Sequence, residues 1–286
     1  MKVTGFSFIR NGTIYDYPFI EAIQSVLPLC DEFVVAVGNS KDDTLERVKA
    51  LGAKIKIIET TWDESLRKGG AVLADETNKA YQAISADTDW CFYIQGDEVL
   101  SEEYLDAVKS AMLLHKNNPE VEGLLFDYLH FYGSYDYIGS APRWYRREIR
   151  VVRKRDDIFS YRDAQGFRKK PNDKLTVKQV GACIYHYGYV RDPKAMQRKS
   201  EEVGVYWGHE AQAVSGKDFD YSGIDALTLF KGKHPIVMQE RLARINWKFD
   251  HDISKTNYSF KQGLKKWIEK LTGYRIGEYK NYILRK

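Results

Sequence analysis

The stretch Trp90-Cys91-Phe92-Tyr93-Ile94-Gln95-Gly96-Asp97-Glu98 joins a short apolar run to an acidic pair. The apolar run predicts a buried β-strand, and the residues after it predict the loop in which that strand ends. In an open α/β sheet, ligands bind in the crevice beyond the carboxyl ends of the strands, where an acidic pair can hold a divalent cation against a phosphate. The stretch therefore predicts a ligand site, provided that the surrounding sequence forms such a sheet.

Short apolar runs alternate with helical patterns upstream of this stretch. Strands are expected at residues 3–9, 32–37, 54–58 and 90–94, and helices at residues 19–29, 44–51 and 73–84. This alternation favours a parallel, doubly wound sheet with right-handed crossovers. Polar loops follow the strands and should converge at one edge of the sheet: Arg10-Asn11-Gly12, Gly38-Asn39-Ser40-Lys41-Asp42-Asp43 and Gln95-Gly96-Asp97-Glu98.

The second half of the chain is less regular. A helical pattern at residues 102–115 is followed by strand patterns at 123–132, 148–153 and 182–187, and by a helical pattern at 193–207. We find no internal repeat and no low-complexity linker in the sequence. The sequence therefore predicts an α/β fold with a mostly parallel central sheet and helices on both faces in residues 1–210, and a C-terminal helical extension in residues 211–286.

Length and composition are typical of a globular protein. The 286 residues are 43% hydrophobic and 29% charged, and no apolar stretch approaches the roughly 20 residues that span a bilayer. The amino-terminal residues lack the apolar region of a signal peptide, and Cys30, Cys91 and Cys183 are too few and too scattered for a disulfide framework. We therefore expect a cytoplasmic protein. Its net charge of +4 does not require nucleic acid as a partner and suits an anionic small molecule or membrane surface.

Aromatic residues are abundant and gather after residue 120. They make up 14% of the chain, with 20 tyrosines. Tyrosine and tryptophan offer a flat apolar face and a polar tip, which suits stacking on sugar or base rings. A wet, irregular core is the alternative interpretation.

Several segments occur in the order found in family 2 glycosyltransferases of the GT-A fold. The segments are Arg10-Asn11 after the first strand, Ser40-Lys41-Asp42-Asp43-Thr44 after the second, Asn78 on the following helix, Gln95-Gly96-Asp97-Glu98, and His186-Tyr187-Gly188-Tyr189. Over roughly its first two-thirds the chain resembles this family. The resemblance implies an inverting enzyme that moves a sugar from a nucleotide-sugar, uridine-linked in our prediction, to a glycan or lipid-linked acceptor of a surface polysaccharide or other glycoconjugate.

The resemblance also implies roles for individual residues. Residues 1–100 would bind the donor and residues 101–210 the acceptor. Asp97 and His186 would hold Mg²⁺ or Mn²⁺ against the donor diphosphate. The predicted nucleotide-sugar contacts are Arg10, Asn11, Asn39, Lys68, Asn78, Gln95, Gly96 and Arg191. The alternatives are a helix N-cap for Asp97 and a core histidine for His186.

The chain departs from the family pattern at two places that matter for chemistry. Gln95 replaces the first carboxylate of the Asp-x-Asp element, which leaves the metal dependence open. The Val-His-Glu segment that carries the general base in many relatives is not reproduced around residues 158–166. Inverting transfer needs a base that takes the proton of the acceptor hydroxyl, and we assign this role to Asp163, with Glu148 as second choice. A solvated loop aspartate is the alternative interpretation of Asp163.

Two other classes of protein remain open at this stage. A nucleotidyltransferase would attack a phosphate instead of a sugar carbon, but the loop Arg10-Asn11-Gly12-Thr13 lacks the glycine-rich pattern that such enzymes show after the first strand. A degenerate, non-catalytic module that binds sugar-nucleotides or glycans is consistent with Gln95.

The tail carries a basic amphipathic pattern. Phe260, Leu264, Trp267, Ile268 and Leu271 recur at helical intervals, and Lys261, Lys265 and Lys270 occupy other faces. Such a helix lies in a membrane interface or packs its apolar stripe on the catalytic domain. Docking at the inner face of the membrane would suit a lipid-linked acceptor.

Overall fold

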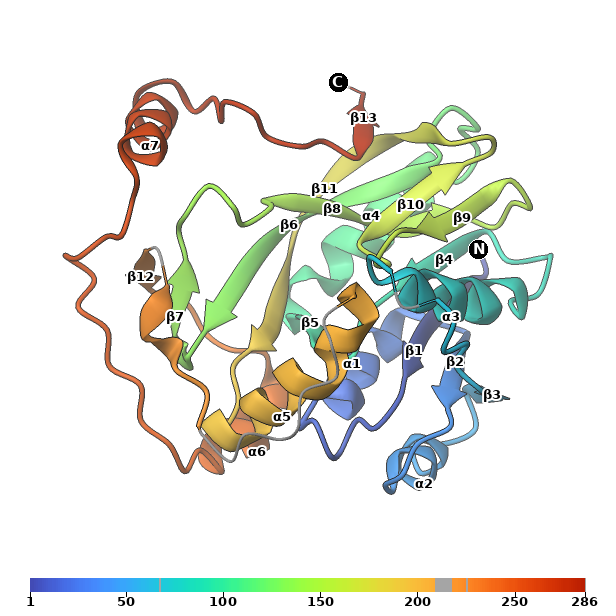
Figure 1. Cartoon of the computed structure of the whole chain (residues 1–286). Coiled ribbons are helices and arrows are strands. Elements are labelled where there is room, and N and C mark those ends of the chain that lie inside the picture. Colours follow the sequence, from blue (N-terminus) through green and yellow to red (C-terminus); the bar gives the residue numbers. More distant parts are fainter. Residues whose placement is uncertain (67, 209–217, 225, 286) are drawn as a thin grey trace.

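The computed structural model describes residues 1–66, 68–208, 218–224 and 226–285 (Figure 1). Four strands of its first half pair in parallel in the order β3-β2-β1-β4. Their bounds are Val3–Ile9 (β1), Glu32–Gly38 (β2), Ile55–Thr60 (β3) and Trp90–Tyr93 (β4). The apolar runs expected as strands are strands in the structure, and they contain mostly β-branched and aromatic residues. β1, β2 and β4 are buried on both faces, whereas β3, at the edge of the sheet, is only partly buried.

Helices cover both faces of this sheet. One face packs against α1 (Phe19–Val26), α2 (Thr44–Lys49) and α4 (Leu105–His115), and the other against α3 (Ala71–Gln82). The alternation of side chains along β2 explains the two layers, because Phe33 and Val35 point into the first and Val34 and Ala36 into the second. The doubly wound α/β class with helices on both faces of the sheet, expected from the sequence, is confirmed by this arrangement.

The second half extends the sheet with a mixture of orientations. Strand β8 pairs antiparallel with β4, β6 pairs antiparallel with β8, and β11 pairs in parallel with β6. The bounds are Gly123–Tyr132 (β6), Arg147–Arg153 (β8) and Asp173–Tyr189 (β11). Strand β11 begins nine residues earlier than the pattern at 182–187 indicated. Its first part alternates polar and apolar residues, and Leu175 and Val177 are buried there.

Short strands complete the sheet around β11. Strands β9 (Ile158–Tyr161) and β10 (Gly166–Lys169) form a hairpin against its start, and β5 (Glu98–Leu100) pairs antiparallel with its end. The others are β7 (Ser134–Gly139), β12 (Leu227–Leu229) and β13 (Tyr282–Leu284). Because β13 pairs with β11, the C-terminal segment returns to the sheet.

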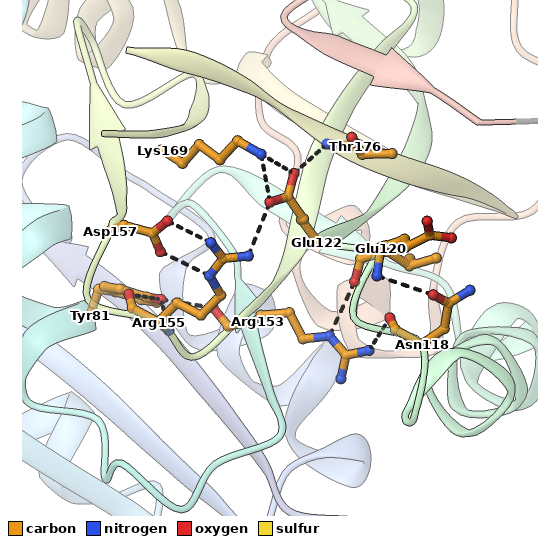
Figure 2. A network of polar contacts seen from close by, with 10 residues as sticks. Tyr81, Asn118, Glu120, Glu122, Arg153, Arg155, Asp157, Lys169 and Thr176 are labelled. Atoms are coloured by element: carbon orange, nitrogen blue, oxygen red, sulfur yellow. Dashed lines mark hydrogen bonds and ion pairs between the residues drawn. The ribbon is translucent and has the colours of Figure 1, made fainter. Parts of the chain in front are cut away.

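A polar network ties these edge strands to the rest of the sheet (Figure 2). The buried carboxylate of Glu122 accepts from Lys169 Nζ at 2.8 Å, from Thr176 N at 2.8 Å and from Arg155 Nη1 at 3.0 Å. Arg155 also pairs with Asp157. A buried carboxylate with several donors is held in one position, so the network orients the β9–β10 hairpin.

The C-terminal part contains α5 (Pro193–Gly204), α6 (Gln239–Ala243) and α7 (Phe260–Thr272). The helix expected at residues 193–207 is confirmed, with a 3₁₀ turn (Val205–Trp207) as its last part. Helix α7 lies at the periphery, away from the sheet, in Figure 1, and none of its residues is buried. Four apolar residues of its stripe, Phe260, Leu264, Trp267 and Leu271, are exposed, so this part of the stripe does not pack on the sheet domain. Within the described ranges, no helix is long and apolar enough to cross a bilayer.

Candidate active site

A cavity of about 920 Å³ lies beyond the carboxyl ends of β1 and β4, where the sequence predicts a ligand site. Its walls come from the loops after these strands, from β6 and β11, from the turn between β9 and β10, and from α5. Helix α5 (orange in Figure 1) covers this end of the sheet. The volume is that of a typical pocket for a ligand of nucleotide size. The lining residues used below are Arg10, Asn11, Gln95, Gly96, Asp97, His130, Trp144, Asp163, His186 and Lys199.

Strand pairing brings Asp97 next to His186. The β5–β11 ladder aligns Glu98 with His186, and the backbone carbonyl of Asp97 accepts from Tyr187 N at 2.7 Å. As a result, Asp97 Oδ1 lies 3.8 Å from His186 Nε2, and Asp97 Oδ2 lies 3.6 Å from Lys199 Nζ. Burial alone would raise the pKa of Asp97, but the positive charges of nearby side chains, Lys199 and Arg191 among them, outweigh it and the pKa is lowered. Asp97 is therefore an anion that faces the cavity.

A second histidine determines the tautomer of His186. His130 lies opposite His186 on the neighbouring parallel strand β6, and their Nδ1 atoms are 3.0 Å apart. His130 Nε2 lies 2.7 Å from the carbonyl oxygen of Tyr145, which can only accept, so this nitrogen carries the proton. In neutral His130, Nδ1 is then the acceptor and His186 Nδ1–H the donor. The lone pair of His186 is therefore on Nε2, the atom that faces Asp97.

Burial keeps both rings neutral. It lowers the pKa of His130 to about 3 and lowers the pKa of His186 as well. A neutral imidazole with a free lone pair is a metal ligand, and its second nitrogen is normally held by a hydrogen bond. His186 and Asp97 are thus suited to hold one divalent cation together. In the part of the chain that the structure describes, no set of three His, Cys, Asp or Glu side chains forms a more complete metal site.

Two further cations lie around Asp97. Lys199 Nζ donates to the carbonyl oxygen of Gly188 at 3.0 Å and lies 4.8 Å from the ring centre of Tyr17. Burial, followed by the neighbouring Arg191, lowers the pKa of Lys199 to about 7. Arg191 is fully buried against the same ring at 4.7 Å and, within the described residues, its guanidinium nitrogens make no hydrogen bond. Arg191 does not line the cavity, but its charge adds to the positive potential beside Asp97.

Glu98 does not face the cavity although it follows Asp97 directly. Its carboxylate forms a bidentate pair with Arg150, at 2.6 and 2.8 Å, and both side chains are fully buried. Tyr128 donates to the same carboxylate at 2.8 Å. A charge paired in this way is part of the core. The acidic pair seen in the sequence is therefore divided between the site and the interior.

One end of the cavity is aromatic and includes the loop after β1. Arg10 lies over the ring of Trp62, 5.2 Å from its centre, and donates to the hydroxyl of Tyr206 at 2.9 Å. Asn11 also lines this end, with its side-chain oxygen accepting from Lys41 N at 2.8 Å. The 3₁₀ turn after α5 thus reaches back to the first strand, and flat rings are available there for a nucleobase.

Another part of the cavity lining is also aromatic and belongs to the second half of the chain. Tyr132 and Tyr189 stack with ring centres 5.6 Å apart, and Trp144 meets Tyr189 edge to face at 5.6 Å. All three line the cavity. Aromatic rings that line a cavity in this way suit the apolar faces of sugars.

Asp163 lies at the tip of the β9–β10 hairpin, near Gly70, whose backbone N–H donates to the carbonyl oxygen of Tyr206 at 2.7 Å. It lines the cavity and is half-buried. The hairpin tip packs closely on the start of α3, because a Cβ at Gly70 would come within 2.7 Å of Asp163 Cβ. Gly70 has φ +72°, a conformation that favours glycine. Glu148, the second choice for the base, lies outside the lining and its carboxylate accepts from Ile149 N at 2.8 Å.

The remaining predicted donor contacts divide into two groups. Gln95 and Gly96 line the cavity, and Gln95 Nε2 donates to the carbonyl oxygen of Ala164 at 3.1 Å. The side chains of Asn39, Lys68 and Asn78 do not line it. Asn78 joins α3 to β9 through two hydrogen bonds to the backbone of Ser160, at 2.8 and 2.9 Å.

Sequence reasoning did not single out Lys199, His130, Tyr17 or Trp62. Lys199 lies on a helix whose pattern was recognised, but many lysines in the chain have the same local surroundings. His130 had one available signal, its position in a strand that precedes the His-Tyr-Gly segment. Neither pattern predicts which residue the side chain contacts. The contact of His130 with His186 depends on strand register, and the contact of Lys199 with Asp97 depends on where α5 crosses the sheet.

Comparisons with known proteins give structural matches only. No family profile matches the chain, and no curated protein sequence is similar to it. Among solved structures, S. aureus TarS 1-349 in complex with UDP-GlcNAc is 14% identical with a TM-score of 0.42, over 72% of this chain and 66% of that one. Glucosyl-3-phosphoglycerate synthase from Mycobacterium tuberculosis, with Mn²⁺, UDP and glucosyl-3-phosphoglycerate, is 18% identical with a TM-score of 0.31, over 46% of this chain and 44% of that one. The chain thus spans less than two thirds of either structure.

Proposed function

We propose that the protein is a glycosyltransferase that moves a sugar, with inversion, from a uridine-linked nucleotide-sugar to a glycan or lipid-linked acceptor. The observation that carries the proposal is the convergence of Asp97, His186 and Lys199 in one cavity with an aromatic surface at each end. The end at Arg10 and Trp62 suits a nucleobase, and the end at Trp144 suits a sugar acceptor. The charged groups between them suit a diphosphate.

The residues at Asp97 fit Mg²⁺ or Mn²⁺. A carboxylate oxygen and an imidazole lone pair face each other, and Mg²⁺ is usually held by one or two carboxylates together with substrate phosphates and water. The imidazole favours Mn²⁺. When bound, the cation would neutralise the negative charge that grows on the leaving nucleoside diphosphate.

The chain's own side chains supply the rest of the mechanism. Lys199 and Arg191 add positive charge beside the diphosphate, and Lys199 can donate to its oxygens. Asp163 accepts the proton of the acceptor hydroxyl while the hydroxyl oxygen bonds to the anomeric carbon and the bond from that carbon to the diphosphate breaks. The attacking hydroxyl and the leaving group lie on opposite faces of the sugar, so the configuration inverts.

Lys199 favours a variant of the same function. Its ammonium already lies 3.6 Å from Asp97, so the positive charge that a metal supplies is present in the protein itself. A transferase that holds the diphosphate with Lys199 alone would not need a cation. The experiment below distinguishes this variant.

The cellular setting is part of the proposal. We place the protein in the cytoplasm, with residues 1–100 binding the donor, residues 101–210 binding the acceptor, and residues 211–286 forming an extension. The boundary between residues 210 and 211 lies outside the described residues.

Thermal unfolding with UDP, GDP, CDP and dTDP, each with and without Mn²⁺, tests the proposal. A ligand at 100 times its Kd stabilises the folded state by about 2.7 kcal/mol. We expect the largest rise in Tm with UDP and Mn²⁺. A rise in Tm with UDP that EDTA does not reduce would support the variant in which Lys199 holds the diphosphate without a cation. The absence of a rise in Tm with every nucleotide would contradict the proposed function. Nucleotide binding without hydrolysis of a donor or transfer from it would contradict the assignment as an enzyme.

A further inference from the structure

Helix α7 presents an apolar stripe to solvent. The stripe consists of Phe260, Leu264, Trp267 and Leu271, whose exposed fractions are 91%, 49%, 60% and 64%. The spacing of these residues places them on one face of the helix. A contiguous exposed apolar face on a helix marks a surface that meets a partner or a membrane.

The charges around the α7 stripe are arranged on either side of it. With about 100° per residue, Lys261 and Lys270 lie on opposite flanks of the stripe, whereas Glu269 lies on the far side of the helix. Glu269 is the only acidic residue of α7, and its side chain is 12% exposed. It accepts from Arg275 Nε at 2.9 Å and pairs with Lys266 at 3.3 Å. The outward surface of α7 is therefore apolar in the middle and basic at both edges.

The helix is specified by its own sequence. Ser259 and Gln262 form a reciprocal capping box, and Gly273 ends the helix in the left-handed conformation with φ +70°. A helix that is capped at both ends without burying a residue can present its stripe before any partner arrives.

We propose that α7 docks the protein on an anionic lipid bilayer, with the α7 stripe inserted among the acyl chains and Lys261 and Lys270 at the headgroups. Lysines on both flanks are attracted by anionic headgroups, and a tryptophan ring suits the boundary between headgroup and acyl chain. The same lysines would repel a second copy of α7. Charge complementarity therefore selects the bilayer over self-association.

The docked helix would lie next to the aromatic end of the cavity. Arg275, just after α7, donates to the carbonyl oxygen of Trp144 at 2.6 Å, and Arg146 pairs with Glu269 at 3.5 Å and with Glu278 at 2.7 Å. Trp144 and Tyr145 line the cavity. Membrane docking would thus bring the acceptor end of the site to the bilayer, and the acceptor would be carried by a membrane lipid. This last step rests on the proposed function.

Flotation with vesicles tests the docking. We would compare the wild-type chain, the double variant Leu264→Gln/Trp267→Gln, and Leu114→Gln as a control, because Leu114 is 77% exposed on α4. On vesicles of phosphatidylcholine with phosphatidylglycerol, we expect binding of the wild type and of Leu114→Gln. The double variant should bind more than about tenfold more weakly, since it loses the burial of two large apolar side chains. Lys261→Gln/Lys270→Gln should weaken binding to these vesicles and leave binding to pure phosphatidylcholine unchanged.

Several outcomes would overturn the proposal. The first is that the wild type does not bind the vesicles, and the second is that the wild type and the double variant bind equally well. The third is that the wild type binds no vesicles but sediments as a dimer that the double substitution abolishes. Each variant should keep the wild-type Tm and the response to UDP, because the changed side chains are exposed and lie outside the cavity. Vesicle binding by a wild-type chain whose Tm does not respond to UDP would contradict the proposed function and leave docking standing. A Tm response to UDP without vesicle binding would contradict docking alone.

Discussion

Individual residues in the cavity owe their state to their neighbours more than to their type. His130 and His186 lie opposite each other on adjacent strands. The carbonyl oxygen of Tyr145 fixes the proton of His130 on Nε2, and the hydrogen bond between the two Nδ1 atoms then leaves the lone pair of His186 on its Nε2. Asp97 and Glu98 are adjacent in sequence, yet one faces the cavity and the other pairs with Arg150 in the core.

The Asp97→Asn variant should lose the Mn²⁺-dependent part of UDP binding. The substitution preserves shape and removes the charge that faces His186 and Lys199. We expect UDP affinity in Mn²⁺ to fall by about 10- to 100-fold, the equivalent of one charged contact. Titration calorimetry with and without EDTA measures this. Equal affinities of the variant and the wild type in Mn²⁺ would remove Asp97 from the metal site.

The Asp163→Asn variant should separate binding from transfer. The side chain lines the cavity but is assigned to the acceptor hydroxyl, so UDP binding should stay at the wild-type level. Loss of a general base lowers kcat by about 10²- to 10⁴-fold. Transfer to a supplied acceptor measures kcat, and Glu148→Gln is the control because Glu148 does not line the cavity. A wild-type kcat in Asp163→Asn would mean that Asp163 is not the general base.

Glu148 should make the protein less stable as the pH rises. Burial raises the pKa of Glu148 to about 7 from its ordinary value of 4.5. The folded state then binds a proton that the unfolded state has released, so the stabilising contribution is complete below about pH 4.5 and is lost as the pH passes through 7. Glu148→Gln lacks this titration. Its free energy of unfolding relative to that of the wild type should therefore rise by on the order of 3 kcal/mol when the pH is raised from 5 to 8. Urea unfolding at both pH values measures this, and a constant difference would contradict it.

At the scale of elements, α5 completes the site. The helix is started by Pro193 and by Asp192, whose side chain accepts from Lys194 N at 2.9 Å, so its direction is set at the end of β11. From there it carries Lys199 to Asp97, and the turn after it carries Tyr206 to Arg10. One helix thus joins the part of the cavity at Arg10 to the part at Asp97.

The Lys199→Met variant tests this role of α5. Methionine keeps most of the apolar stem against Tyr17 and removes the ammonium. Without metal, UDP affinity should fall by about 10- to 100-fold through the lost charged hydrogen bond. Mn²⁺ affinity should rise, because Asp97 no longer has a competing cation. Electron paramagnetic resonance of Mn²⁺ measures the second effect, and Lys194→Met, exposed on the same helix, is the control. A simultaneous loss of both affinities would indicate a collapsed site instead.

At the scale of the whole molecule, the C-terminal segment is anchored at its end, while α7 within it keeps its apolar stripe exposed. Strand β13 pairs with β11, Asn281 and Tyr282 are buried, and Glu278 binds Arg146 at 2.7 and 2.8 Å. Helix α7, which precedes these contacts, buries no residue. The tail is therefore held in place while its apolar stripe stays available.

Truncation after Gly277 should destabilise the fold. It removes a buried tyrosine side chain and the pairing of β13, and loss of such a side chain alone costs about 3 kcal/mol. We expect a clear drop in Tm, whereas Leu264→Gln/Trp267→Gln should leave Tm unchanged. Calorimetry compares the two. An unchanged Tm after truncation would mean that the C-terminal strand does not pair stably with β11.

Local amino-acid patterns were enough to predict the α/β class, the parallel strands of the first half, the helices between them, and the edge of the sheet where the cavity lies. These features follow from local patterns, because the period of apolar residues and the polar loops that end the strands are encoded within short segments. Arg10, Asn11, Gln95, Gly96, Asp97, Asp163 and His186 were named in advance and line that cavity, and their chemical roles stay predictions.

The features that join distant segments could be seen only in the folded chain. The pairing of β6 with β11 set the histidine tautomers, the path of α5 brought Lys199 to Asp97, and the burial of Arg150 drew Glu98 into the core. The same holds for Asn78, which joins α3 to β9, and for the α7 stripe, whose exposure could not be read from its period. The physical reason is that register, burial and partner choice depend on contacts between residues far apart in the chain.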